Sequence, residues 1–239
     1  MRYTKNKLEI ELLKIFSAEK DRHKNRYNIL GRGLPGSPGS LEYQMQTTFT
    51  ADERALAGQA INELESRGLI VPTYKDLSSP GDWLIITSLG EGALKTGALD
   101  ELDNLLLKIK SDNDLLSMRY GAYEAMISKH ADWPRHVASS CRELITKVLH
   151  AIAPDEEVIK DLRFIPDESS KNKITRKERI RHYLRKNLDI SKRNVEVVDK
   201  ACNLIEACYK KLNAVTHTDI KEAECLVKLT ENALFFLLN

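Results

Sequence analysis

A repeat of apolar residues at helical spacing runs through the second half of the chain and restricts the folds open to it. Between residues 193 and 212 the intervals are four, three, four and three, at Val198, Cys202, Ile205, Tyr209 and Leu212. The same pattern predicts further helices over about residues 115–130, 134–152, 175–187 and 218–238. Each of these helices has one apolar face that a neighbour must cover. We therefore predict an all-α helical bundle over residues 115–239.

The first half of the chain combines helical and strand-like patterns. Apolar spacing predicts a helix over residues 7–19. Thr50 followed by Glu53 is a capping-box signature, and it predicts a second helix that Gly68 ends. Two short β-like runs follow, at residues 69–71 and 83–87, with a turn-rich tip between them. Helix, helix and hairpin is the element order of a winged helix.

Sequence likeness points the same way. The segment INELESRGLIVPTY, followed by a hairpin and LIITSLGEGAL, resembles winged-helix domains over about residues 5–97. The helix that would enter a DNA groove, residues 51–67, has four acids against two arginines, a local charge of −2. Phosphates repel such a helix, so we favour protein contact or dimerisation over sequence-specific DNA reading. Basic residues in the loop 20–32 and Lys75 in the wing would partly offset this repulsion.

A connecting segment separates the two halves. A helix is expected over about residues 100–110, and residues 111–114 are a hinge candidate. We predict a mainly α protein in three parts: a winged-helix domain, a linker helix with hinge, and a helical bundle, at residues 1–97, 98–114 and 115–239. Loops are expected at the Gly-, Pro- and Ser-rich residues 30–40 and at the acidic residues 154–173.

Composition restricts the cellular setting and the cofactor classes. The four cysteines lie in apolar helical patterns without CxxC spacing, so we expect them to be reduced in a cytoplasmic protein. The charged N-terminal sequence does not resemble a signal peptide, and no apolar run is long enough for a membrane span. A phosphate-binding GxxxxGK[ST] loop, HExxH and other metal-ligand patterns are missing from the sequence. We expect no cofactor, no metal and no membrane contact.

The stretch KKLNAVTHT (210–218) places a histidine before the last helix. It resembles the signature of HEPN domains, helical proteins of prokaryotic defence and toxin systems, in which a basic residue and then a histidine open the last helix. The resemblance implies metal-independent RNA cleavage with His217 as general acid or base and with Lys211 and Asn213 orienting the phosphate. This chain departs from the pattern because lysine stands where arginine is usual. The alternative is a structural His217 that contacts the helix end near Asn213 and Thr218.

Residues 171–193 form a basic run of ten Lys or Arg against two acids, a local charge of +8. Such a surface attracts a phosphate backbone through counterion release. The candidate nucleic-acid ligands in this run are Arg176, Lys177, Arg179, Arg181 and Arg185. The alternative is pairing with the adjacent acidic segment 155–168, which has six Asp or Glu.

Three patterns along the second half, SxRELxxxxLxxxAPD, TRKxRIRxxL and LNxxxH, resemble the predicted pPIWI-associating nucleases over about residues 115–238. That resemblance singles out Arg142, Glu143, Arg176, Arg179 and His217. Arg142 lies at the flank of an apolar stripe, where it is a further candidate for nucleic-acid binding. A purely structural alternative pairs Arg142 with Glu206 to fix helix packing.

These observations favour a protein of bacterial antiviral defence or of a toxin system that binds RNA through a HEPN-like bundle. Whether the protein also cleaves the RNA is left open by the sequence. RNA is favoured over DNA, and family analogy implies a homodimer and a partner protein of the same defence system. The alternative, from a different class, is a non-catalytic winged-helix adaptor or transcriptional regulator whose bundle dimerises or binds a partner protein.

Overall fold

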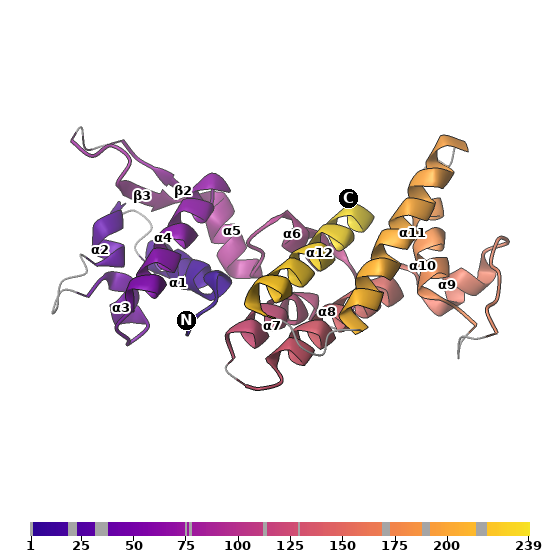
Figure 1. The fold of residues 1–239 in the computed structure, drawn as a ribbon. Helices are drawn as coiled ribbons and strands as arrows, with labels where there is room; N and C mark the ends of the chain where they lie inside the picture. The colour runs from indigo at the N-terminus through magenta and orange to yellow at the C-terminus, as the bar shows by residue number, and fades with distance from the viewer. Residues whose placement is uncertain are drawn as a thin grey trace. The chain divides into compact units, whose positions relative to one another are not determined.

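The computed structural model divides the chain into two compact units, residues 1–100 and 101–239 (Figure 1). It describes residues 2–18, 23–31, 38–74, 76, 78–111, 114–128, 130–168, 173–187, 192–213 and 219–239, with the backbone alone at 192–199, 201 and 220. The first unit contains helices and a small antiparallel sheet, and the second is entirely helical where it is described. The expected fold class is therefore confirmed.

The first unit holds eight described elements. They are α1 (Lys5–Ala18), β1 (Lys24–Asn25), α2 (Arg26–Leu30), α3 (Ser40–Gln44), α4 (Ala51–Ser66), β2 (Ile70–Pro72), β3 (Trp83–Ile86) and α5 (Ser88–Thr96). The strands pair in the order β1-β3-β2, and Val71 lies opposite Ile85. Leu12 of α1 and Ile61 of α4 are fully buried where these two helices pack.

The capping box at Thr50 forms as expected. The Thr50 hydroxyl accepts from the Glu53 amide at 3.3 Å, and the Glu53 carboxylate accepts from the Thr50 amide at 3.0 Å. The same carboxylate binds the Arg2 guanidinium at 2.7 Å and is 1% exposed. This ion pair ties the start of the chain to the start of α4.

Three features of the first unit were not expected from the sequence. The basic loop contains the two-residue β1 and the one-turn α2, and a second short helix, α3, begins at Ser40. A fifth helix, α5, follows β3 directly; a Cβ added at its Gly90 would lie 2.1 Å from the Leu69 carbonyl oxygen. Because glycine has no Cβ, α5 can pack directly against the backbone at Leu69. The element order is richer than the simple helix, helix and hairpin, and membership of the winged-helix class stays a prediction.

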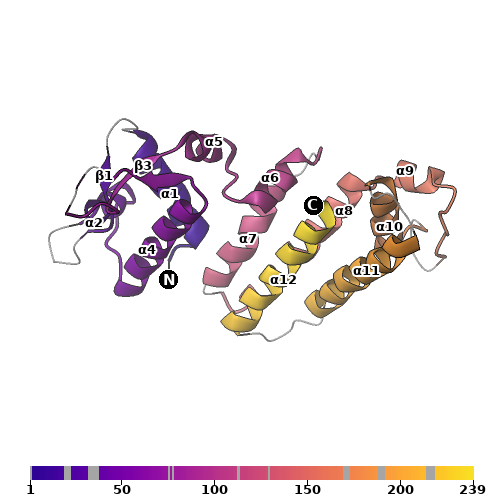
Figure 2. The ribbon, with the colours of Figure 1, turned by 90° about the horizontal axis from the view of Figure 1, so that it is seen from above.

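The second unit holds seven described helices. They are α6 (Glu101–Lys108), α7 (Leu115–Ile127), α8 (Trp133–Ile152), α9 (Asp155–Lys160), α10 (Arg176–Asn187), α11 (Lys192–Asn213) and α12 (Ile220–Leu238). Figure 2 shows α7, α12 and α11 side by side. Helix α8 is central, because α7, α10, α11 and α12 all pack against it.

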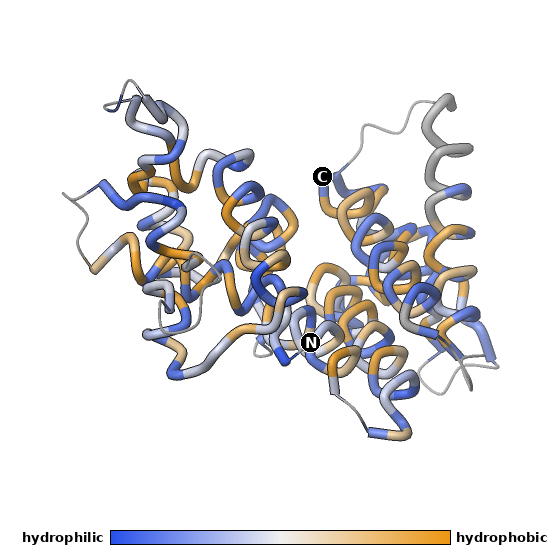
Figure 3. Tube along the Cα trace, turned by 60° about the vertical axis from the view of Figure 1, so that its left-hand side comes forward, coloured by the Kyte–Doolittle hydropathy of each residue, from blue (hydrophilic) through white to orange (hydrophobic). Residues whose placement is uncertain are grey.

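One continuous core joins these helices. Ile145 and Val148 of α8 are fully buried, and Ile180 of α10 and Leu234 of α12 reach the same cluster. Figure 3 shows apolar and polar residues alternating along the helices of this unit, as amphipathic helices require. The helices expected from periodicity are present within three residues of their expected ends.

Helix α6, expected to lie in a linker, packs within the second unit. Leu102 and Leu106 belong to its core cluster. Asp103 is fully buried and binds the buried Arg119 of α7, whose Nε donates to Glu231 of α12 at 2.6 Å. Three helices are therefore joined by one buried guanidinium. The hinge candidate falls partly on residues 112–113, which lie outside the described residues.

The acidic segment after α8 is not all loop, contrary to expectation. Pro154 precedes the short helix α9, and Asp155, Glu156 and Glu157 lie in its first turn, where the helix dipole favours negative charge. Val158 is its one buried residue. A six-residue helix with one apolar contact has too little periodicity to be detected from the sequence.

Candidate nucleic-acid interface

Asn213 and Arg142, two of the predicted site residues, meet in the structure. The Arg142 guanidinium donates to the Asn213 side-chain oxygen at 2.8 Å, across 71 residues of sequence. The proposed pair of Arg142 with Glu206 is not formed; Glu206 accepts from Arg176 at 3.1 Å instead. Arg142 therefore links the middle of α8 to the last residue of α11. His217 falls in residues 214–218, outside the described residues.

Lys211 has a different neighbour. Its ammonium lies 2.9 Å from the Glu222 carboxylate in the first turn of α12, and both side chains are about half exposed. An exposed pair of this kind contributes little to stability and is readily exchanged for another anion. Asn213 and Lys211 thus face different helices: Asn213 contacts α8 and Lys211 contacts α12.

Arg176 is fixed by two residues of α11. Beside its ion pair with Glu206, its guanidinium lies 3.7 Å from the centre of the Tyr209 ring. That distance is well within the range of a cation–π contact. The planar group is consequently held in one orientation at the start of α10.

Most of the remaining basic run contacts acids of its own unit. Arg179 is 3% exposed, and its guanidinium donates to the Ala153 carbonyl and to Asp155. Toward the end of α10 the ion pairs are Arg181–Glu178 at 2.9 Å, Arg185–Asp161 at 3.6 Å and Lys186–Glu157 at 2.8 Å. The pairing with the acidic segment, left open from the sequence, is therefore present. It reduces the positive charge that this part of the chain offers to a ligand.

Arg176 and Lys177 instead line a hollow of about 680 Å³ between α8, α10 and α11. Thr146 and His150 border it from α8, and Tyr209 and Lys210 from α11. A second hollow, of about 490 Å³, shares Thr146 and His150 and is lined by Lys110 and Lys147 on its other side. We refer to them as the α11-side hollow and the α6-side hollow. Thr146 and His150 lie on the border between them, and His150 is the titratable one of the two.

His150 was not singled out from the sequence beyond being one of six histidines. Its ring is half exposed, with Nδ1 3.9 Å from a carboxylate oxygen of Asp155. Partial burial, and then the positive charge of Arg179, lower the pKa of His150 below its usual value. The ring is therefore neutral at pH 7. A usable signal was its place on α8, four and eight residues after Thr146 and Arg142, on the same helical face.

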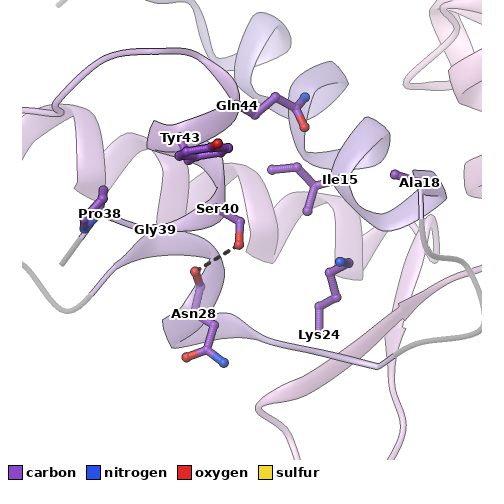
Figure 4. A pocket seen from close by; sticks show the side chains of 9 residues that line it. All are labelled: Ile15, Ala18, Lys24, Asn28, Pro38, Gly39, Ser40, Tyr43 and Gln44. Atoms are coloured by element: carbon purple, nitrogen blue, oxygen red, sulfur yellow. Dashed lines mark hydrogen bonds between the residues drawn. The ribbon is translucent and has the colours of Figure 1, made fainter.

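The first unit has a hollow of its own, of about 500 Å³, beside α1 and α3. Figure 4 shows Tyr43, Gln44 and Lys24 around it, and the Ser40 hydroxyl donating to the Asn28 carbonyl. Arg54 of α4 and Arg67, the residue that caps its end, are engaged inside this unit: Arg54 binds Glu42 at 2.9 Å, and Arg67 binds Glu63 at 2.7 Å. Neither arginine is held out toward a nucleic acid. Lys75 lies outside the described residues.

The described ranges contain neither a cluster of metal-ligand side chains nor a membrane-spanning helix. No three His, Cys, Asp or Glu side chains gather there as metal ligands would. In the same part of the chain, no helix has the length and apolar character needed to cross a membrane.

The second unit is thus a helical domain with a cation-lined polar face, of the kind that nucleases use to hold a phosphate backbone. Residues 107–234 match the family model described as predicted pPIWI-associating nuclease, which covers more than half of the chain. The chain belongs to this family, as the resemblance in its second half indicated, and a nuclease-like role in defence follows at the level of the family. No curated protein and no solved structure matches the chain.

Proposed function

We propose that the second unit binds RNA on the face formed by α8, α10 and α11 and cleaves it next to the end of α11. The observation that carries this proposal is the 2.8 Å contact of Arg142 with Asn213. It joins two residues selected from separate sequence patterns, and one of them, Asn213, is four residues before His217. Family membership supports nuclease chemistry in general, and the HEPN resemblance supports RNA as the substrate.

The proposed reaction is an internal transesterification. The ribose 2′-oxygen bonds to the phosphorus, and its proton passes to a base. The bond from phosphorus to the 5′-oxygen breaks, and that oxygen takes up a proton. The products are a 2′,3′-cyclic phosphate and a 5′-hydroxyl, so no net water is consumed. His217 would serve one of the two proton transfers, since a histidine exchanges protons readily near neutral pH.

Of the six predicted nucleic-acid ligands, Arg142, Arg176 and Lys177 are proposed to contact the backbone directly. Arg142 and Asn213 would orient the reacting phosphate, and Lys211 would approach it by leaving its exposed pair with Glu222. Arg176 also pairs with an acid, but its side chain is 36% exposed, whereas Arg179, Arg181 and Arg185 are less exposed beside their acids, so the contribution of these three would be to the long-range field.

The decisive experiment replaces His217 with alanine and measures cleavage of an end-labelled RNA, together with toxicity on expression. His130→Ala, an exposed histidine between α7 and α8, is the matched control. Loss of cleavage in His217→Ala alone supports the proposal, as does a cyclic phosphate among the wild-type products. Unchanged cleavage in His217→Ala eliminates His217 as the catalyst.

The competing function is a non-catalytic adaptor or regulator that contacts a protein partner. It is favoured by the ion pairs that engage Arg54 and Arg67 on α4 and much of α10. Under this alternative, wild-type protein shows no cleavage, and pull-down with proteins encoded beside the gene identifies a partner.

We also propose that the protein forms a homodimer. By analogy with HEPN domains, two copies would face each other through their second units, so that two histidines meet. Light scattering coupled to size exclusion measures this directly, and a mass of one chain at micromolar concentration would contradict the homodimer.

A further inference from the structure

His150 stands where two hollows meet, and each hollow carries its own lysines. Lys110 and Lys147 line the α6-side hollow, and among the described residues that line it there is no carboxylate. Lys177 and Lys210 line the α11-side hollow. Within the described part of the chain, none of these four lysines has an ion-pair partner. This sets them apart from the paired cations farther along α10.

The α11-side hollow also contains acids, which must be weighed against its lysines. Glu206 is held by Arg176, so the two charges cancel locally. Arg179, which also lines this hollow, is paired with Asp155. Asp167, which has contacts of its own, is the other acid of the lining, against Lys177 and Lys210. The net charge of the α11-side hollow is therefore positive. The α6-side hollow is also positive, and no carboxylate lines it among the described residues.

The two hollows lie on opposite sides of one helical ridge. Thr146 and His150, one turn apart on α8, border both of them. A ligand that fills both must cross this ridge and carry negative charge on each side of it. An isolated phosphate or a mononucleotide occupies one hollow only, whereas a polynucleotide backbone repeats its negative charge along its length.

We propose that the two hollows are successive phosphate subsites for a single-stranded RNA backbone that crosses α8 at His150. Lys110 and Lys147 would bind the phosphate on one side, and Lys177 and Lys210 the phosphate on the other. His150 would donate a hydrogen bond to the segment that crosses the ridge, because its neutral ring has one N–H. A flexible single strand follows such a ridge, while a stiff duplex does not.

The site is separate from the proposed point of cleavage. His150 is eight residues from Arg142 on α8, or about 12 Å along the helix axis. The inference rests on the proposed function for the choice of RNA, and it adds where the backbone runs beyond the reacting phosphate. Binding to this track is therefore measurable in a chain that does not cleave.

The test uses the full chain carrying His217→Ala and a fluorescein-labelled 12-nucleotide RNA, read by anisotropy at several salt concentrations. We compare Lys110→Gln/Lys147→Gln, Lys177→Gln/Lys210→Gln and the control Lys160→Gln/Lys228→Gln, which removes two exposed lysines outside both hollows. Circular dichroism and thermal unfolding confirm that each variant is folded.

Each hollow variant is expected to weaken binding about tenfold at low salt and to reduce the salt slope by about 0.7, the value for one phosphate contact on a single strand. The control should leave both quantities unchanged. A mononucleotide should respond to one hollow variant at most, and a duplex of the same length should bind more weakly than the single strand. Equal weakening by the control, an effect of only one hollow on the 12-nucleotide RNA, or tighter duplex binding would each overturn the proposal. Retained cleavage by the single variant His217→Ala would instead count against the proposed catalyst and leave these binding results interpretable.

Discussion

Helix α10 has cations near both of its ends, and they meet different surroundings. At its start, Lys177 lines the α11-side hollow and has no acidic partner among the described residues. Toward its end, Arg185 and Lys186 bind Asp161 and Glu157. The same residue types on one helix are thus available to a ligand in one region and neutralised in the other. The local charge of +8 therefore overstates the positive charge that the folded surface presents to a ligand. Acids of α9 and of the loop after it pair with Arg179, Arg185 and Lys186.

Replacing Arg179 should cause the largest change in the free energy of unfolding among the cations of α10. Arg179→Ala removes a buried guanidinium together with its hydrogen bonds to Asp155 and to the Ala153 carbonyl. Two hydrogen bonds from a buried charged group together contribute about 3 kcal/mol. Urea unfolding followed by circular dichroism measures the loss. Arg185→Ala, which removes a more exposed guanidinium in a longer ion pair, should cost below about 1 kcal/mol; equal losses for the two variants would contradict the distinction between a structural and a surface cation.

Two single substitutions of equal charge compare the ends of α10 in binding. Lys177→Gln should weaken RNA binding severalfold and lower the salt slope by less than about 0.7, the value for one whole phosphate contact, because Lys210 still binds the phosphate in the α11-side hollow. Lys186→Gln removes the same charge but also releases Glu157, so its effect on the slope should be near zero. Anisotropy titrations of both variants provide the measurement. A larger effect for Lys186→Gln would mean that the paired region binds the RNA.

The ridge between the hollows should respond to pH. Because burial and Arg179 lower the pKa of His150, its ring stays neutral at pH 7 and gains a proton only below the usual range of histidine, about 6.5. The charged groups that act on its pKa are Arg179, Asp155 and Lys147. The other charged residues that line the two hollows with it are Lys110, Asp167, Arg176, Lys177, Glu206 and Lys210. A protonated His150 adds positive charge, so RNA affinity should rise by a few fold from pH 7 toward pH 5. In His150→Gln this rise should be missing; an unchanged profile would assign it to another group.

The smallest expected effect is a difference in the rates at which the four cysteines react with a thiol reagent. These rates report on the core of the second unit, on which both ends of α10 pack. Burial raises the pKa of Cys141 to about 12, and Cys202 and Cys208 are also buried, while Cys225 is exposed. At pH 8 a thiol reagent should therefore modify Cys225 rapidly and the other three slowly. Mass spectrometry of the labelled peptides identifies them. In Arg179→Ala, faster labelling of Cys141 would show that the bundle around α8 opens more often.

Periodicity explains which parts of the fold could be predicted. Long amphipathic helices such as α8 and α11 carry several buried residues at regular spacing, so their positions follow from the pattern alone. The capping box at Thr50 was equally local. The two-residue β1 and the six-residue α9 have no such repeat, and their stability comes from partners distant in sequence.

The candidate site was harder to predict, because its geometry depends on how helices meet. Spacing selected Arg142 and Asn213 separately, and only the packing of α11 on α8 shows that they touch. The same packing gives Glu206 to Arg176. His150 belongs to no motif, and its interest comes from the lysines of other segments that gather on either side of it.

The buried triad of Asp103, Arg119 and Glu231 has a consequence for how the protein is shortened. The family match begins at residue 107, inside α6, whereas the physical unit begins at Glu101. A fragment cut at the edge of the match would lack Asp103 and would therefore remove one of the carboxylates that bind the buried Arg119. It would also uncover the surface that Leu102 and Leu106 occupy. A fragment meant to fold and bind RNA on its own should therefore keep all of α6.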